Sequence, residues 1–378
     1  MNPAGIYLHI PFCKRICYYC DFYRRRDLRL KDAFLQALEH EVHVRAPHWK
    51  EERFTTIYFG GGTPSLLKKE ELQHLLDLLH SFFHIEEKAE VTLEANPEDL
   101  NREYLKELLR IGFNRLSVGV QSFQDDLLRL MNRRHDAAKA EKVLREAADA
   151  GFKNITADLI YGIPGLEPEM WEEDLRKMFG LPVQHLSAYL LTFEERTVFG
   201  KWLEQGRIMR PQEETVLQQY RLLRKLSEEH GFVHYEISNL GREGFFSQHN
   251  LLYWQGGKYL GLGPSAHSYD GSTRRWNLAD LEGYLKAKER GEEPPYEKER
   301  ADERIRFNDL LLTRLRTMWG IDMAAAEEQW PAVITEPARR TLEKWIKTGH
   351  VERKGTVYRL TGEGMFLSDT IISECMAV

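Results

Sequence analysis

Three cysteines stand within eight positions near the start of the chain, in "CKRICYYC". Cys13, Cys17 and Cys20 are separated by three and by two residues, and the only other cysteine, Cys375, lies near the C-terminus. Thiolates are the preferred ligands of iron–sulfur clusters, and this spacing lets one short loop wrap a compact cluster. Three ligands on a four-iron cube would leave one iron open to a small molecule.

A structural zinc site is the alternative for these cysteines. His9 is the nearby histidine that could act as a fourth ligand, although it falls inside a predicted strand. Structural zinc sites usually draw two pairs of ligands from separate knuckles, so the spacing favours a cluster. A disulfide knot is disfavoured because thiols stay reduced in the cytoplasm, which is the expected compartment.

The composition describes an ordinary globular chain. Of its 378 residues, 42% are hydrophobic and 30% are charged, and the net charge is −6. A nucleic-acid binder usually carries a basic surplus, so we expect no nucleic-acid partner. The sequence shows neither a signal-peptide pattern nor an apolar run long enough to cross a bilayer. We therefore expect a cytoplasmic protein.

The elements that must position the cysteines are strands that alternate with helices. The predicted strands are "GIYLHI" (5–10), "TTIYFG" (55–60), "EVTLEA" (90–95), "RLSVGVQS" (115–122), "NITADLIYG" (154–162) and "HLSAYLL" (185–191). Amphipathic helices are predicted at 69–83 and 140–151. This alternation indicates an α/β fold with parallel strands, either a doubly wound sheet or an incomplete βα barrel.

In both folds the chemistry lies at the carboxyl ends of the strands. Polar or glycine-rich segments follow five of the predicted strands. They are the cysteine loop after Ile10, "GGGTP" after Phe59, "EANP" after Leu93, "QSF" after Val120 and "YGIPG" after Leu159. We expect these segments to share one rim and to form one site.

The pattern changes after about residue 230. "FVHYEISN" indicates one more strand, and residues 249–269 are expected to be loop with short strands. The Pro/Glu-rich stretch 291–299 is predicted to be a linker between a first domain at 1–290 and a second at 300–378. Helical patterns at 303–316, 322–329 and 335–348, followed by the hairpin "VERKGTVYRLT", resemble a winged helix. Its mixed charges suit a docking or lid module.

These motifs together resemble the radical S-adenosylmethionine superfamily. Besides the cysteines, the matching stretches are "IYLHIPFC", "YFGGGTPS", "LEANPE", "LSVGVQSF", "MNRRHD", "DLIYGIPG", "HNLLYW" and "YLGLGPSAHS". The resemblance covers nearly the whole chain and narrows to the branch of the oxygen-independent coproporphyrinogen III oxidases. It implies an incomplete (β/α)6 barrel with a C-terminal helical, winged-helix-like domain, a 4Fe-4S cluster, and S-adenosylmethionine as the ligand of the open iron.

The resemblance also carries over individual residues. Cys13, Cys17 and Cys20 match the cluster ligands. The positions that match cofactor contacts are Tyr7, Tyr19, Gly61, Gly62, Thr63, Glu94, Gln121, Arg133 (or its neighbour Arg134), Asp158, Ala188 and Ala266. Each charged residue among these could instead be an ordinary ion-pair residue. Asp158 is the exception, because it lies in an apolar strand and needs a partner.

Within this branch the chain looks most like the haem chaperones of the HemW type. The oxidases carry a further cysteine where this chain has Phe22, and a longer N-terminal arm where only twelve residues precede Cys13. The chaperones carry an H-N-x-x-Y-W signature, found here at His249–Trp254. Imidazole is a standard ligand of haem iron, so His249 is the candidate haem ligand, although it could equally be a structural histidine.

The resemblance therefore implies a protein that binds haem as cargo and delivers it to haemoproteins, with contact to a membrane surface as one option. The main alternative is an oxygen-independent coproporphyrinogen III dehydrogenase, and another radical enzyme or a zinc protein stays open. No catalytic residue is assigned. The sequence leaves open the haem recipient, the oligomeric state and whether S-adenosylmethionine is cleaved.

Overall fold

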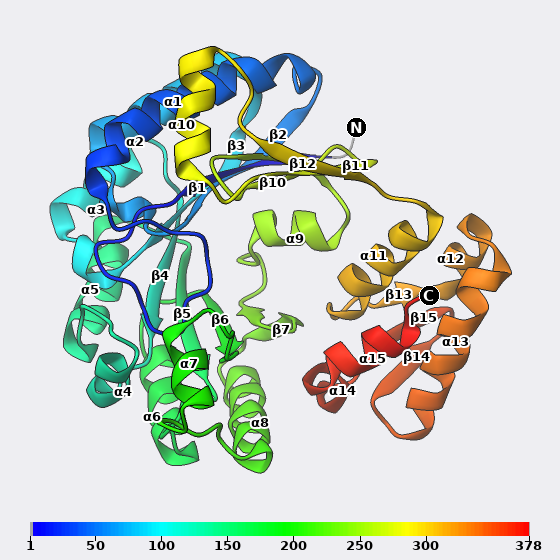
Figure 1. The fold of residues 1–378 in the computed structure, drawn as a ribbon. Helices are drawn as coiled ribbons and strands as arrows, with labels where there is room; N and C mark the ends of the chain where they lie inside the picture. Colours follow the sequence, from blue (N-terminus) through cyan, green and yellow to red (C-terminus); the bar gives the residue numbers. More distant parts are fainter. Residues whose placement is uncertain (1–2, 378) are drawn as a thin grey trace.

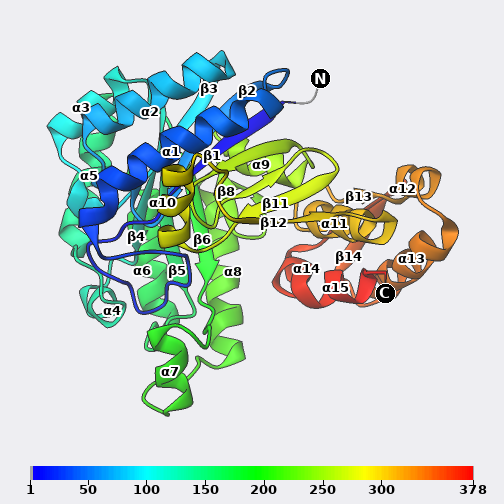
Figure 2. The ribbon, with the colours of Figure 1, turned by 45° about the horizontal axis from the view of Figure 1, so that its top comes forward.

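The computed structural model describes residues 3–377 and contains a large sheet and a small one (Figure 1). In the described residues the large sheet has 12 strands in the order β12-β11-β10-β9-β1-β2-β3-β4-β5-β6-β8-β7. Its two outer strands, β12 and β7, do not pair with each other, so the barrel is incomplete. Helices lie on the outer side of the curved sheet, and the C-terminal domain lies beside its open side (Figures 1 and 2).

The six predicted strands form the parallel centre of this sheet. They are β1 (Ala4–Ile10), β2 (Arg53–Gly61), β3 (His84–Ala95), β4 (Arg115–Gln121), β5 (Ile155–Tyr161) and β6 (His185–Leu190). Each pairs in parallel with the next. This arrangement confirms the expected incomplete βα barrel, because each crossover between parallel neighbours passes over the outer face of the sheet.

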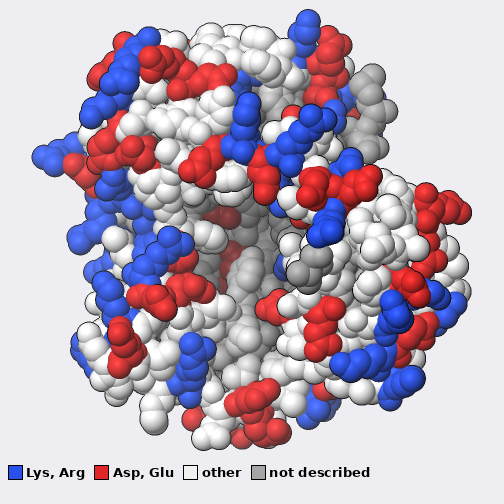
Figure 3. Space-filling view, turned by 45° about the vertical axis from the view of Figure 1, so that its right-hand side comes forward, with Lys and Arg blue, Asp and Glu red and all other residues white. Residues whose placement is uncertain are grey.

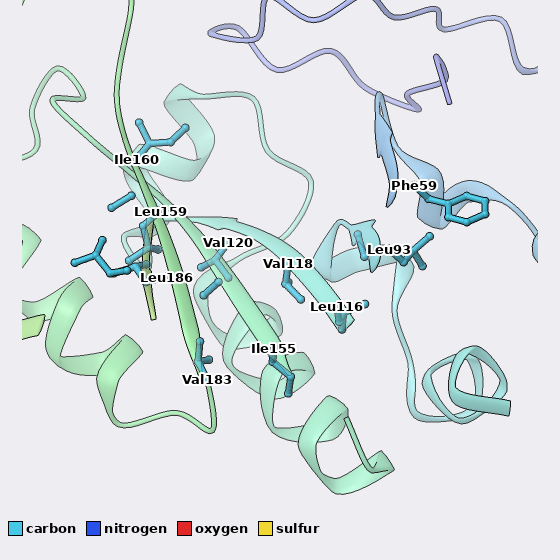
Figure 4. Close-up of a cluster of buried hydrophobic side chains, with 14 of the residues drawn as sticks. Phe59, Leu93, Leu116, Val118, Val120, Ile155, Leu159, Ile160, Val183 and Leu186 are labelled. Carbon is cyan, nitrogen blue, oxygen red and sulfur yellow. The ribbon is translucent and has the colours of Figure 1, made fainter. Parts of the chain in front are cut away.

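Helices cover the outer face of the parallel strands. They are α1 (Lys31–Arg45), α2 (Lys69–Phe82), α3 (Arg102–Arg110), α5 (Ala137–Ala150), α6 (Pro168–Phe179) and α8 (Glu213–Glu229), and α10 (Leu281–Arg290) packs on α1. The short helix α4 (Asp125–Leu130) precedes α5, and α7 (Val198–Glu204) lies against the cysteine loop, where the Phe199 N–H donates to the Tyr18 carbonyl (3.0 Å). Gly151 ends α5 as predicted, with φ of 122°. The core lies between sheet and helices, and Figure 4 shows part of it, including Val118, Leu159 and Leu186.

Antiparallel strands extend the parallel centre on both sides. They are β7 (Val233–Glu236) and β8 (Asn239–Gly241) beside β6, and β10 (His267–Tyr269), β11 (Thr273–Asn277) and β12 (Tyr296–Arg300) on the other side. Between β1 and β10 lies β9 (Lys258–Leu262), which is parallel to β1 and antiparallel to β10. The strand predicted in "FVHYEISN" is confirmed as β7, but it ends at Glu236, where the chain reverses so that β8 pairs antiparallel with it. Part of the predicted linker is the exposed edge strand β12, whereas the domain boundaries themselves stay a prediction.

The segment "QHNLLYW", expected to be loop, forms helix α9 (Gln248–Trp254). Ser247 caps this helix, since its side chain accepts a hydrogen bond from the backbone N–H of Asn250 (3.3 Å). This short helix was not predicted because the surrounding residues are rich in glycine and aromatic side chains, a composition typical of loops. Helix α9 packs on the inner side of the barrel against β1, β2 and β9.

The C-terminal domain has the expected three helices and two-stranded wing, followed by the short helices α14 and α15, and one strand, β13, is added to the wing. Its elements are α11 (Glu303–Leu315), β13 (Ile321–Asp322), α12 (Met323–Gln329), α13 (Ala332–Lys347), β14 (Val351–Lys354), β15 (Val357–Leu360), α14 (Gly362–Phe366) and α15 (Ser368–Cys375). The segment after α11 binds the free edge of β7, because Ile237 N–H donates to the Arg316 carbonyl (3.1 Å) and Met318 N–H to the Tyr235 carbonyl (3.0 Å). No helix among the described residues is long and apolar enough to cross a membrane.

Candidate functional site

The cysteine loop leaves β1 at the carboxyl end of the barrel and is fixed at several points. Cys13 N–H donates to the Arg25 carbonyl (3.0 Å), which closes the loop at its base. On the far side, the Asn132 side chain donates to the Ile16 carbonyl (2.8 Å), and Tyr18 N–H donates to the Met131 carbonyl (3.2 Å). The loop is therefore held against the segment between α4 and α5.

Two side chains donate hydrogen bonds to cysteine sulfurs. The Thr63 hydroxyl lies 3.4 Å from Cys13 Sγ, and the Arg133 guanidinium lies 3.3 Å from Cys17 Sγ. Burial raises the pKa of the Cys13 thiol to about 11 and also raises the pKa of Cys20. The donors are therefore placed where thiolates bound to iron would need them, and loading the cluster must release protons.

His9 does not join the cysteines as a zinc ligand. Its Nδ1 lies 3.2 Å from the Tyr7 hydroxyl, and its Nε2 lies 2.9 Å from the Tyr23 carbonyl, so both ring nitrogens are used. Among residues 3–377, no group of three or more His, Cys, Asp or Glu side chains has the arrangement of a single-ion metal site. A four-iron cube holds its ligands further apart than a single ion does.

The glycines of "GGGTP" let the turn after β2 approach the cysteine loop. Gly61 has φ of 105°, in the region that favours glycine. A Cβ on Gly62 would lie 2.8 Å from the carbonyl oxygens of Ile10 and Phe12, which is too close. The N–H groups of Gly61 and Gly62 already donate to Glu94 (3.2 Å) and Ile10 (2.9 Å). The Thr63 carbonyl that follows accepts from the Leu66 N–H (3.1 Å), which fixes the end of this turn.

Two carboxyl groups lie inside the barrel at the ends of β3 and β5. Glu94 accepts from the Tyr58 hydroxyl (2.8 Å), and Asp158 accepts from the Ser117 hydroxyl (3.2 Å). Burial raises the pKa of Glu94 to about 7 and that of Asp158 to about 6, despite these donors. Both side chains line one polar cavity, together with Ser187.

Arg133 lines a second pocket together with Cys17, Thr63 and Asn96. Its guanidinium donates to the Asn96 side chain (2.6 Å) and to the Gly119 carbonyl (2.7 Å). Its Nε is buried and has no partner among the described residues. Its neighbour Arg134 instead forms ion pairs with Glu98 and Asp99, at 3.5 Å each. Of the two, Arg133 is the one turned toward the cysteines.

Gln121 lies next to Arg133 in an unusual conformation. Its φ of 70° is rare for a residue other than glycine. A Cβ on Gly119 would lie 2.8 Å from the Gln121 amide and 3.3 Å from the Arg133 guanidinium, so both side chains cross the same glycine. The fold thus holds a polar amide beside the cation, at the end of β4.

The remaining predicted contacts surround these groups. Tyr7 stacks on Tyr58 (6.1 Å between ring centres), and Tyr19 is close enough to Cys17 for their charges to interact. Ala188 and Ala266 are buried. The N–H of Ala188 donates to Ser238 (2.8 Å), and both backbone groups of Ala266 are bonded within the protein. Contacts from these two alanines to an adenine would therefore be mainly apolar.

The residues present fit a cluster with a bound amino-acid cofactor. Three thiols lie in one loop, two donors point at their sulfurs, and the buried Nε of Arg133 is a donor that a carboxylate could satisfy. The carboxylate of Glu94 suits an ammonium group or hydroxyls. A cluster with S-adenosylmethionine supplies reductive cleavage of the sulfonium when bound.

The structure does not support His249 as a haem ligand. The side chain is 1% exposed, its Nδ1 lies 2.7 Å from the Thr56 hydroxyl, and its Nε2 lies 2.8 Å from the Tyr253 hydroxyl. Burial lowers the pKa of His249 to about 3. His249 is buried because helix α9, which carries it, packs against β2 on the inner side of the barrel. Both ring nitrogens of His249 are thus engaged inside the protein in this structure, and its role as a haem ligand stays a prediction.

Sequence reasoning missed Tyr58 and Asn96 as site residues. Tyr58 lies two residues before the first glycine of the turn, Gly60, and Asn96 belongs to the "EANP" segment, so both lie close to motifs that the sequence analysis recognised. Their roles depend on hydrogen bonds to Glu94 and Arg133 across neighbouring strands. Only the register of the sheet reveals such contacts.

Comparison with known proteins agrees with this site. The Radical SAM superfamily profile matches residues 7–178. The heme chaperone HemW of Mycobacterium tuberculosis (strain H37Rv) is 34% identical over 377 residues, covering 98% of this chain and 94% of the relative. The heme chaperone HemW of Bacillus subtilis (strain 168) is 38% identical over 281 residues, covering 74% of each chain.

A solved structure supports the same assignment. Coproporphyrinogen III oxidase (HemN) from Escherichia coli, described as a radical SAM enzyme, superposes with a TM-score of 0.86 at 25% identity, covering 100% of this chain and 90% of the oxidase. Fold, cysteine loop and whole-chain similarity thus agree, and the chain belongs to the radical S-adenosylmethionine superfamily, in the HemN-like family that includes the HemW chaperones.

Proposed function

We propose that this protein is a haem chaperone, which binds haem and passes it to recipient haemoproteins. The observation that carries the proposal is the 34% identity to a haem chaperone over 98% of the chain. Similarity of this extent includes the barrel, helix α9 and the C-terminal domain. A shared radical SAM domain alone would not distinguish a chaperone from an enzyme.

In this proposal the cysteine loop holds a 4Fe-4S cluster through Cys13, Cys17 and Cys20. Arg133 pairs with the carboxylate of S-adenosylmethionine, and Glu94 accepts hydrogen bonds from its amino group or hydroxyls. The cluster and its ligand serve the structure, the assembly of subunits or the reductive release of haem. The recipient haemoproteins, and any contact with a membrane surface, belong to the same proposal.

Oxygen-independent coproporphyrinogen III oxidation is the second candidate, which the similarity to HemN favours. Against it stands the position two residues after Cys20, where the oxidases carry a further cysteine and this chain has Phe22. The Phe22 side chain is 68% exposed. It contributes an apolar surface beside the cluster loop and no sulfur ligand.

One experiment separates the two candidates. The anaerobically reconstituted protein is titrated with ferric haem, and in parallel it is incubated with coproporphyrinogen III, S-adenosylmethionine and a reductant. The chaperone proposal expects a stoichiometric Soret shift and no porphyrinogen-dependent 5′-deoxyadenosine. Formation of 5′-deoxyadenosine with protoporphyrinogen, or the absence of haem binding, would reject it.

A further inference from the structure

Four histidines lie around the mouth and lumen of the barrel, and they differ in what their side chains touch. His9, His185 and His249 are buried. His9 and His249 use both ring nitrogens, and the Nε2 of His185 lies 2.7 Å from the Tyr235 hydroxyl. His267 is the exposed member of this set, and no described residue hydrogen-bonds its ring.

The strand that carries His267 places it at the cofactor site. Residues 263–266 form the loop before β10, and this loop contributes Ala266. A Cβ on Gly261 would lie 2.0 Å from the His267 carbonyl oxygen, so the His267 backbone passes directly over Gly261. Gly261 is the cross-strand partner of Tyr7 in β1. His267 therefore lies beside β9, one strand away from β1, the strand that leads into the cysteine loop.

The side chain of His267 points away from the outer helices. The next residue, Ser268, contacts Arg45 of α1 (3.2 Å), so it faces the helical layer. Because side chains alternate along a strand, His267 faces the opposite side. Arg274, on the neighbouring strand, forms an ion pair with Asp309 of α11 (2.6 Å). This face of the sheet therefore borders the C-terminal domain, on the side of the molecule where Figure 3 shows a hollow.

Trp276 holds the imidazole in a defined orientation. It is the cross-strand partner of His267, and the two rings stack at 5.9 Å between centres with an angle of 21°. The indole is itself fixed, since its N–H donates to Glu297 (3.1 Å). A ring stacked on its face presents its edge, with the nitrogens, to the surroundings. An axial ligand must approach haem iron with this edge.

We propose that His267, rather than His249, donates the axial nitrogen to the iron of bound haem. This inference rests on the proposed function, since it names the ligand of the cargo. Partial burial and the charge of Arg274 lower the pKa of His267, which keeps its imidazole neutral near pH 7. A neutral ring has the free lone pair that metal ligation requires.

The test is a ferric-haem titration followed by the Soret band and by the low-spin signal in electron paramagnetic resonance. Four proteins are compared: the natural chain, His267→Ala, His249→Gln and His80→Ala. Glutamine at 249 can keep hydrogen bonds to Thr56 and Tyr253, so that variant is expected to fold. His80 is an exposed histidine on α2, on the outer layer, and its variant controls for the loss of a surface imidazole.

We expect His267→Ala to bind haem at least tenfold more weakly and to lose the low-spin signal, while the other two variants bind like the natural chain. The proposal is overturned if His267→Ala matches the natural chain, or if His249→Gln loses binding with an unchanged melting temperature. If the natural chain itself binds no haem, the proposed function falls as well. The first two results leave that function standing and reject only the ligand.

Discussion

Glu94 is the residue whose replacement tests the electrostatics of the barrel most simply. Its carboxyl group lies inside the barrel, where burial raises its pKa from 4.5 to about 7. Glutamine has nearly the same shape, can still accept from the Tyr58 hydroxyl and carries no charge. Glu94→Gln therefore removes the ionisation and leaves most contacts in place.

The magnitude follows from the difference in pKa between the folded and the unfolded chain. Because the folded pKa is the higher one, the folded state binds the proton more tightly, and stability is lost as pH rises from about 4.5 to about 7. At 1.36 kcal/mol for each unit, the loss reaches about 3 kcal/mol above pH 7. Glu94→Gln should therefore equal the natural chain near pH 4.5 and exceed its stability at pH 8.

The assay is thermal unfolding of the cluster-free protein between pH 4.5 and pH 8.5. A difference of about 3 kcal/mol corresponds to a rise in Tm on the order of 5 °C for the variant at pH 8. Glu87→Gln, at an exposed position of the same strand, is the matched control and should follow the natural chain at every pH. A constant difference between Glu94→Gln and the natural chain across this range would refute the reasoning.

Three further substitutions probe the cluster loop and the barrel core. Gly62→Ala should at least halve the iron bound after reconstitution, measured by iron analysis, because its Cβ would lie 2.8 Å from backbone oxygens of the loop. Thr63→Val should lower the reduction potential of the cluster in a spectroscopic redox titration, since it removes the hydrogen bond to Cys13 that stabilises thiolate charge; an unchanged potential would contradict this. Arg115→Met should cost about 3–5 kcal/mol in denaturant unfolding, because it removes the only cation paired in the described residues with the buried Glu90 carboxylate, 3.9 Å away. A loss below about 1 kcal/mol would contradict this, and would indicate that the N–H groups of Gln248 and His249 are sufficient partners for Glu90.

The parallel centre of the fold could be predicted because its strands are continuous apolar runs. In β1, the alternate residues Ile6, Leu8 and Ile10 are fully buried on the side of α1, as expected for a strand covered by a helix. The reversal between β7 and β8 was not predicted, because no glycine or proline marks the turn in "FVHYEISN". Helix α9 was missed for the opposite reason: aromatic residues and glycines around it are typical of loops.

The site was predictable where a residue acts through its position in a motif, and less so where it acts through a distant partner. Cys13 and Gly62 follow directly from the loop and turn that contain them. The burial of His249 could not be predicted, because it depends on Thr56, which is 193 residues earlier and meets it at 2.7 Å. The exposure of His267 likewise depends on how the loop before β10 crosses Gly261.

The transfer of haem to a recipient tests the central claim most directly. The haem-loaded protein is mixed with the haem-free form of a b-type haemoprotein, and the recipient's absorbance is followed over time. We predict that the recipient fills faster from the loaded protein than from an equal concentration of free haem, and that His267→Ala abolishes the advantage. Equal rates from the loaded protein and from free haem would contradict the account.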